Sequence, residues 1–202
     1  IPLRGEANFG IIKIDSNGTV FPVPSALPST RRFLAGDVSP DGSTFYLNTY
    51  PSSTMYIVDL DTMAVTPRAL IGGPVSVADW AVNPIDQMLY GAVGRGPTAD
   101  TGGKVYRLNP DTGVISLVGS PTGLPLASGG NGQYYGGAWF NQFGLLFLYR
   151  NSDWLYEIDL SGPVIVEDFA GAAGSSTFND AAACAAANPT VDKFYTHTWN
   201  DW

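Results

Sequence analysis

A short strand pattern that ends in Asp or Asn recurs four times along the chain and constrains the fold more than any other feature. The four copies are Ile12–Asp15, Tyr56–Asp59, Tyr106–Asn109 and Tyr156–Asp159. From Tyr56 to Tyr106, and again from Tyr106 to Tyr156, the period is 50 residues. A period of this length is too long for a hairpin and is typical of one blade of a β-propeller.

Each copy is followed by a tight turn and then by further short β-rich stretches. The turns are residues 16–18, 60–63, 110–113 and 160–162. The later strands are expected near residues 19–21, 37–39 and 45–47 in the first repeat and at matching places in the second and third. The pattern predicts an all-β fold, a β-propeller of four-stranded antiparallel blades. We expect a single domain over residues 1–202, with repeats at approximately 7–51, 52–100, 101–152 and 153–202.

The second half of the last repeat departs from this pattern. Residues 180–187 form an Ala-rich run, which has a high intrinsic helix propensity. Its place in the repeat favours a strand instead, because Asn188-Pro189 matches Asn83-Pro84, and Phe194-Tyr195 matches Leu89-Tyr90. We expect a strand, with a short helix as the alternative.

Charge and hydropathy exclude two classes of function. The chain carries 10 Lys and Arg against 18 Asp and Glu, a net charge of −8, whereas binding a polyanion requires clustered cations. No run of 18 apolar residues indicates a membrane span. Few charged residues and many Ser, Thr, Asn and Gly indicate a secreted or cell-surface protein.

Two residues are candidates for covalent modification. Asn17 stands in Asn17-Gly18-Thr19, an acceptor sequence for N-glycosylation on an expected exposed turn, although such a turn favours Asn-Gly in any case. Cys184 is the only cysteine. It is either a small buried apolar residue or half of a disulfide to a segment outside this chain.

Several sequence segments resemble those of a family of uncharacterised secreted repeat proteins of bacteria and fungi with propeller-like domains. They are residues 56–62, 78–86, 89–91, 106–113 and Gly136–Phe140. The family commonly carries Asn-Asp-Gly-Ala-Arg-Cys near its end. Here Asn179, Asp180 and Cys184 keep the Asn, Asp and Cys, whereas Ala replaces the Gly and the Arg.

The resemblance implies one more blade at the amino end, often preceded by a cysteine. The four repeats either close alone or belong to a five-bladed ring, in which the missing strands come from the parent chain or from another chain. In such a parent, Cys184 would link the last blade to the first. The family motifs are turns and strands and imply no chemistry.

Catalytic motifs are scarce. His197 is the only histidine, and the chain has no Gly-x-Ser-x-Gly, HExxH, CxxC or Walker sequence. The remaining candidates are Asp37, Asp79 and Asp180, which stand at expected inner strands and could converge on a central channel. Converging carboxylates hold Ca²⁺ or serve as acid and base on a glycosidic bond. The alternative is that each one caps a turn through its own backbone N–H groups. No other cofactor is expected.

The longest insertion, residues 120–136, carries amides and aromatic rings suited to stacking on a sugar and hydrogen-bonding its hydroxyls. The candidate ligand-binding residues are Asn131, Gln133, Tyr134, Tyr135 and Trp154. Packing between blades is the alternative for the tyrosines and the expected role of Trp139.

We therefore expect a secreted, non-catalytic binding or scaffold module that recognises glycan or protein on one propeller face. The first alternative is an extracellular carbohydrate-active hydrolase or lyase that uses the converging carboxylates. The second is a self-assembling extracellular structural protein, because an open ring leaves unpaired strand edges. An enzyme is the less favoured of these classes.

Overall fold

The computed structural model describes most of the chain between residues 11 and 198 and shows an all-β protein. The described residues are 11–14, 17–23, 27, 33–49, 53–73, 76–94, 103–120, 124, 134–151, 154–160, 166–169, 179–181 and 196–198. Every element among them is a strand, so the expected fold class is confirmed at this level. Within this part of the chain no helix is long and apolar enough to cross a membrane.

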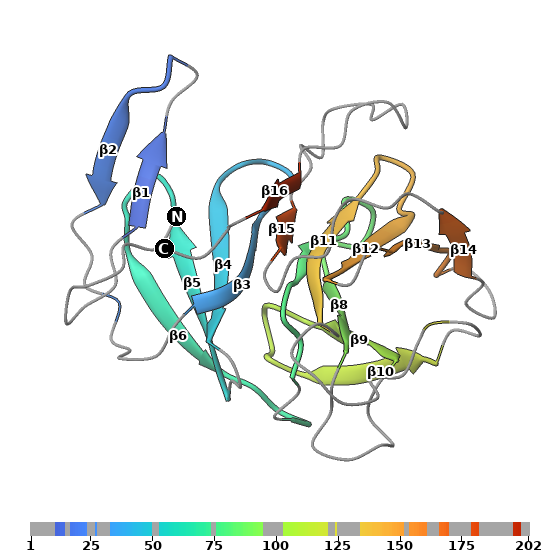
Figure 1. Ribbon diagram of the computed structural model, residues 1–202. Helices are drawn as coiled ribbons and strands as arrows, with labels where there is room; N and C mark the ends of the chain where they lie inside the picture. Colours follow the sequence, from blue (N-terminus) through green and yellow to red (C-terminus); the bar gives the residue numbers. More distant parts are fainter. Residues whose placement is uncertain are drawn as a thin grey trace.

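Three four-stranded antiparallel sheets form the body of the molecule (Figure 1). The first contains β3 (Phe33–Val38), β4 (Thr44–Thr49), β5 (Thr54–Asp59) and β6 (Val65–Ala69). The second contains β7 (Ala81–Val82), β8 (Leu89–Val93), β9 (Lys104–Leu108) and β10 (Ile115–Gly119). The third contains β11 (Tyr135–Phe140), β12 (Leu146–Arg150), β13 (Trp154–Ile158) and β14 (Val166–Phe169).

Two hairpins form separate two-stranded sheets. One pairs β1 (Ile11–Ile14) with β2 (Val20–Val23), and the other pairs β15 (Asn179–Ala181) with β16 (Thr196–Thr198). β15 agrees with the strand expected at the start of the Ala-rich run. Residues 182–187 and Cys184 lie outside the described residues.

The strands of each sheet follow one another in chain order, and successive sheets meet through their first strands. β3 contacts β7, β7 contacts β11, and β11 contacts β15. In Figure 1, β3, β11 and β15 lie toward the middle of the molecule, whereas β6, β10 and β14 lie at its periphery. The first strands therefore form the contact line between sheets.

The sheets are out of phase with the sequence repeat. The recurring Tyr-containing strand is β5, β9 or β13, the third strand of its sheet. Each four-stranded sheet thus takes its first two strands from one repeat and its last two from the next. This phase links neighbouring repeats through backbone pairing as well as side-chain packing.

The core consists of apolar clusters between and within these sheets. The largest includes Tyr135, Leu146, Leu148 and Ile158, each at most 1% exposed. Trp139 is buried and stacks on Phe147, with ring centroids 5.5 Å apart. Trp139 is therefore a core residue as expected, and the ring on which it stacks belongs to its own sheet.

Candidate functional site

Asp37 joins the first strand of one sheet to the first strand of the next. It lies in β3, and its Oδ1 accepts the backbone N–H of Val38 at 2.8 Å. Its Oδ2 accepts the backbone N–H of Val82, in β7, also at 2.8 Å. A first strand has one edge without a neighbouring strand, so its N–H groups need partners from elsewhere.

Asp79 repeats the same bridge one sheet further on. Its Oδ1 accepts the N–H of Trp80 at 2.9 Å, and its Oδ2 accepts the N–H of Ala138, in β11, at 2.7 Å. Only 3% of Asp79 is exposed. A carboxylate that accepts a backbone N–H on each oxygen makes two charge-assisted hydrogen bonds, which are stronger than neutral ones.

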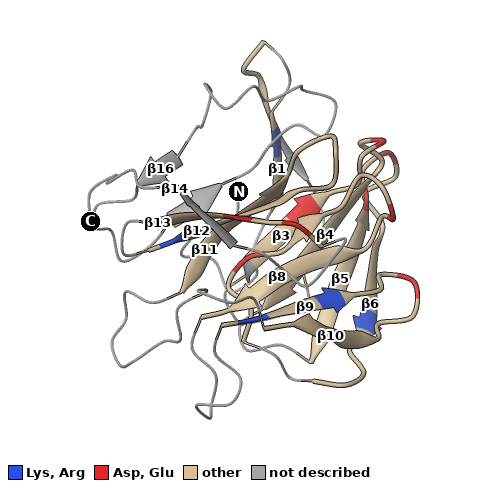
Figure 2. Cartoon of the chain, turned by 90° about the vertical axis from the view of Figure 1, so that its right-hand side faces the viewer, with Lys and Arg blue, Asp and Glu red and all other residues tan. Residues whose placement is uncertain are grey.

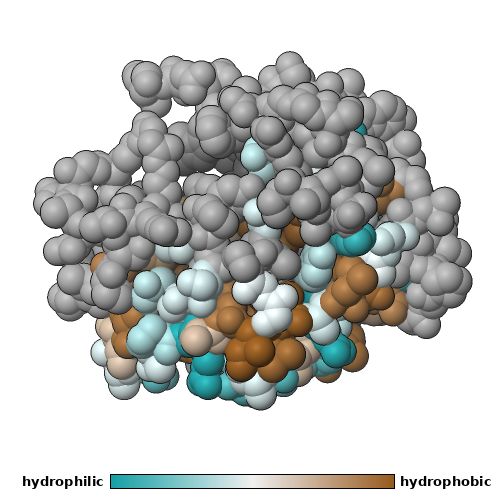
Figure 3. All heavy atoms as spheres, turned by 90° about the horizontal axis from the view of Figure 1, so that it is seen from below, coloured by the Kyte–Doolittle hydropathy of each residue, from teal (hydrophilic) through white to brown (hydrophobic). Residues whose placement is uncertain are grey.

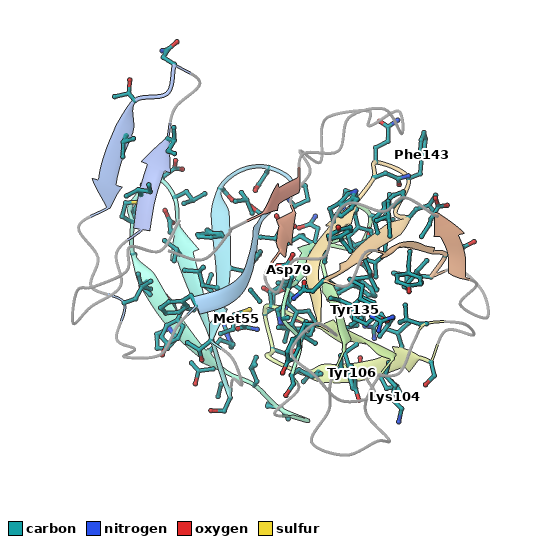
Figure 4. All side chains as sticks on the ribbon, viewed as in Figure 1. Met55, Asp79, Lys104, Tyr106, Tyr135 and Phe143 are labelled. Atoms are coloured by element: carbon teal, nitrogen blue, oxygen red, sulfur yellow. The ribbon has the colours of Figure 1, made fainter. Side chains whose placement is uncertain are left out.

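A third polar contact ties the first two sheets together beside these bridges. Asn48 is buried in β4. With its amide oriented to donate to the Leu47 carbonyl at 3.1 Å, Asn48 accepts the Nε1–H of Trp80 at 2.9 Å. Figure 4 shows Asp79 in the middle of the molecule, between the sheets.

These bonds bear on the expected calcium or acid–base site. Asp37 and Asp79 each accept the backbone N–H of the next residue and one N–H from the following sheet, so they connect sheets instead of only capping a turn. Asp180 lies in β15, and its side chain is outside the described residues. Among the described residues no three His, Cys, Asp or Glu side chains gather closely enough to hold a metal ion.

Those predicted ligand residues that the structure describes lie at one end of the third sheet. Tyr135 pairs with Arg150, and Arg150 pairs with Trp154, so the three form one row across β11, β12 and β13. The side chain of Trp154 lies outside the described residues, as do Asn131 and Gln133 altogether. Tyr134 is half-buried, and its carbonyl accepts the Asn151 N–H at 2.9 Å.

Tyr135 is a core residue rather than a surface platform for a ligand. It is 1% exposed, and its ring meets that of Tyr156 edge to face, with centroids 6.0 Å apart. Burial, and to a smaller extent Tyr156, raises the pKa of Tyr135, which Arg150 partly offsets. The packing alternative therefore describes Tyr135.

The opposite end of the same sheet carries an apolar surface that the sequence analysis missed. Phe143, in the β11–β12 turn, is 72% exposed, and Ile85, in the β7–β8 turn, is 67% exposed. A Cβ built on Gly144 would lie 3.0 Å from Ile85 Cγ1, so the two turns touch. Figure 4 shows Phe143 at the tip of its hairpin, pointing away from the sheet. We call Ile85 and Phe143 the turn pair.

Acidic residues accompany the turns between first and second strands. Asp41 lies in the β3–β4 turn, and Asp86 lies beside Ile85 in the β7–β8 turn. Asp86 Oδ2 accepts the Tyr90 hydroxyl at 2.6 Å. Burial and this carboxylate raise the pKa of Tyr90 to about 12. In Figure 2 much of the red of the acidic residues lies on turns, whereas the described Lys and Arg residues lie on strands.

A second group of exposed apolar side chains lies at the outer edge of the sheets. Ile71 and Val114 form an isolated bridge between the end of β6 and the start of β10, and they are 58% and 42% exposed. Leu117, in β10, is 54% exposed. Figure 3 shows the molecule from below, the side on which β6 and β10 lie in Figure 1. Apolar side chains gather on this face.

Comparison with known proteins identifies the family of this chain. The profile of a repeat of unknown function, DUF6923, matches residues 4–186. The chain belongs to this repeat family. A comparison with curated proteins found no significant match.

Solved structures agree on the fold. One is a protein of unknown function from Desulfotomaculum acetoxidans, with a TM-score of 0.56 and 20% identity over 82% of this chain and 51% of that one. Another is a catalytically inactive variant of virginiamycin B lyase from Staphylococcus aureus with quinupristin, with a TM-score of 0.54 and 15% identity over 85% of this chain and 51% of that one. The WD40 repeats of RRP9 match with a TM-score of 0.50 and 14% identity, over 78% of this chain and 44% of theirs.

The chain thus spans about half the length of the structures it matches. At these identities the likeness concerns the fold alone, which is that of propeller-like repeat proteins. The expected resemblance to a propeller-like repeat family is confirmed to that extent.

Proposed function

We propose that this chain is a non-catalytic binding or scaffold module, that its sheets are blades of a propeller, and that the turn pair contacts a protein partner. One observation carries the proposal. The inward carboxylates Asp37 and Asp79 bind main-chain donors of successive first strands, while the exposed apolar side chains Ile85 and Phe143 are displayed on neighbouring turns.

The bridging role of the aspartates favours a binding module over a hydrolase. A glycosidase needs one carboxyl that holds a proton for the leaving group and another that faces the sugar or a water. Each oxygen of Asp79 instead accepts an N–H at 2.9 Å or less in a site that is 3% exposed. These bonds stabilise the ionised form and take one acceptor position on each oxygen of a carboxylate that is shielded from solvent.

The chemistry of the turn pair indicates the kind of partner. Exposed apolar side chains on two turns that contact each other favour burial against another apolar surface. Asp86 adjoins Ile85, and the whole chain carries a net charge of −8. Complementary charge steers association, so the partner would present apolar side chains among Lys or Arg.

A defined peptide library can test this proposal. We expect a phage-displayed library of random peptides, selected on the immobilised chain, to yield peptides that combine aromatic or aliphatic residues with Lys or Arg. These peptides should lose binding to an Ile85→Ser/Phe143→Ser variant. They should still bind Ile71→Ser/Leu117→Ser, which removes two exposed apolar side chains at the outer edge.

Equal binding to both double variants, or no enrichment of basic and apolar peptides, would refute the turn pair as the binding surface. Both variants change exposed side chains only, and circular dichroism and thermal unfolding would verify that each remains folded.

A secreted location and a glycan at Asn17 belong to the same proposal. Asn17 is exposed in the β1–β2 turn, followed by Gly18 at a φ of +81°. Expression through a eukaryotic secretory pathway should give a product that loses mass on treatment with an N-glycosidase, and Asn17→Gln should abolish that shift. Recognition of glycan through Asn131, Gln133 and Trp154 stays a separate prediction.

A further inference from the structure

Two hairpins of the chain have half as many strands as the other sheets. β1–β2 and β15–β16 are two-stranded, whereas the three sheets between them in the chain are four-stranded. The two hairpins together supply the number of strands that one further sheet would need.

β15 and β16 hold the places of first and second strand. β15 contacts β11 as β11 contacts β7 and as β7 contacts β3. β15 pairs with β16 in antiparallel fashion, as β11 pairs with β12. Among the described strands none pairs with the other edge of β16, where the complete sheets have their third strand.

β1 and β2 hold the places of third and fourth strand. β1 leads into Asp15 as β5 contains Asp59 at its end, and each is followed by a tight turn. The turn after β1 has Gly18 at a φ of +81°, and the turn after β9 has Gly113 at +74°. The partner missing from this hairpin is a second strand on the free edge of β1.

Burial indicates that β1 lacks the cover for which its sequence is suited. The last apolar residue of the third strand is Val58 in β5, Leu108 in β9 and Ile158 in β13, and all three are 0% exposed. Its equivalent in β1 is Ile14, which is 49% exposed.

The repeat also fixes how β16 and β1 would align. Matching Phe194-Tyr195 with Leu89-Tyr90 makes His197 equivalent to Ala92, and Ala92 pairs with Val105. Val105 stands three residues before Leu108, as Ile11 stands three before Ile14. His197 would therefore face Ile11, and Thr196 would face Ile12.

The pairing inside the last hairpin agrees with this alignment. Asp180 pairs with His197. Ala81 pairs with Tyr90 in antiparallel fashion. Continuing that register, Asp79, two residues before Ala81, stands opposite Ala92, two residues after Tyr90. With His197 taken as equivalent to Ala92, Asp180 is placed at the position of Asp79, and the two residues are of the same type.

We propose that β1 docks on the free edge of β16 of the same chain and completes a fourth sheet in the order β15-β16-β1-β2. Backbone pairing would satisfy both free edges, and Ile14 would gain the environment of its buried equivalents. Docking within one chain is favoured over docking on a second copy, because a tethered strand has an effective concentration of about millimolar order. The proposal does not depend on the ligand.

Engineered disulfides test the docking. In a Cys184→Ser background, one variant combines Ile12→Cys with Thr196→Cys, and a second combines Ile11→Cys with His197→Cys. Hydrogen-bonded and non-hydrogen-bonded pairs alternate along antiparallel strands, so the two variants cover both geometries. The control combines Val20→Cys with Thr196→Cys. Val20 lies on β2, one strand further away, or about 9–10 Å from β16 after docking, which is too far for a disulfide.

We expect mild oxidation of the dilute protein to give a monomeric, internally linked product for at least one of the two test variants and none for the control. Non-reducing gels and light scattering distinguish this product from a linked dimer. A linked dimer would assign the edge of β16 to a second copy, and no link in either test variant would refute the pairing. Both results would overturn the proposal.

Discussion

Ile158 and Ile14 occupy equivalent places at the end of a third strand, yet Ile158 is 0% exposed and Ile14 is 49% exposed. Ile158 lies in a four-stranded sheet whose neighbours cover it, and Ile14 lies in the β1–β2 hairpin. The same repeat pattern therefore gives different burial in the two regions.

The difference follows from how a repeat of this kind becomes stable. A single unit cannot bury its apolar face alone and depends on the sheets beside it. In the complete sheets the dependence is met by side-chain packing and by the backbone bridges from Asp37 and Asp79. The stability of each strand thus depends on its contacts with neighbouring sheets more than on its own sequence.

The largest expected effect is at this matched pair of isoleucines. Ile158→Ala removes a fully buried side chain and should lower the free energy of unfolding by about 2–5 kcal/mol. Ile14→Ala should cost less than about 1 kcal/mol if the side chain stays half exposed, and about 2 kcal/mol or more if β1 docks on β16. We expect the larger value, measured by urea unfolding.

A small loss for Ile14→Ala would keep the two regions distinct and would count against the docking. Exposed Leu117, 54% exposed in β10, is the control, and Leu117→Ala should change stability by no more than about 0.5 kcal/mol.

Removing one acceptor from an aspartate bridge should give the next largest effect. Asp79→Asn keeps the shape of the side chain but replaces one carboxylate oxygen with a donor that faces a backbone N–H. We expect a loss of about 2–3 kcal/mol, because a buried hydrogen bond to a charged group is broken. Asp37→Asn should cost less, because Asp37 is only half-buried. Equal losses at the two sites would show that burial does not set the strength of these bridges.

Two glycines compare a turn packed between sheets with a turn in open space. Gly113, with a φ of +74°, packs so closely on the Ala69 carbonyl that a Cβ would overlap it, whereas Gly42, with a φ of +75°, has no atom within 4 Å of that position. Gly42→Ala should cost about 1 kcal/mol from the backbone conformation alone. Gly113→Ala should cost about 1–2 kcal/mol more, measured by thermal unfolding. Equal costs would mean that the contact between β6 and the β9–β10 turn relaxes freely.

Local chemistry made the strands and their turns predictable from the sequence. Asp59 and Asn109 end the recurring strand pattern just before a tight turn, and each accepts two backbone N–H groups of that turn through Oδ1. Val58, Leu108 and Ile158 recur at one position of the repeated pattern, and that pattern located β5, β9 and β13 along the chain.

Interactions between sheets were less predictable. Asp37 and Asp79 both precede an apolar residue, but nothing in the sequence tells which backbone N–H of the next sheet each will meet, 45 or 59 residues away. The contact between Gly144 and Ile85 of the β7–β8 turn likewise cannot be read from the sequence. The phase of the sheets was also hidden, because a repeat can be cut at any strand without changing its period.

The smallest expected effect concerns acid, at a turn of the first complete sheet. Asp41 accepts hydrogen bonds from the Ser39 hydroxyl and from the backbone and hydroxyl of Ser43, which lower its pKa from 3.8 to about 2. The folded chain then binds this proton less readily than the unfolded chain, so the contribution is present above pH 3.8 and is lost as the pH falls toward about 2. Asp41→Asn should therefore flatten the pH dependence of stability in that window and leave it unchanged near pH 7. Because Asp41 is exposed, the change should be small, and urea unfolding at closely spaced pH values is the suitable measurement.

The control is the β1–β2 turn, which has Asn17 and Gly18 where the β3–β4 turn has Asp41 and Gly42. Asn17→Gln should leave the pH dependence of stability in the same window unchanged. An unchanged slope in Asp41→Asn would mean that the Ser39 and Ser43 hydrogen bonds persist equally in the unfolded chain.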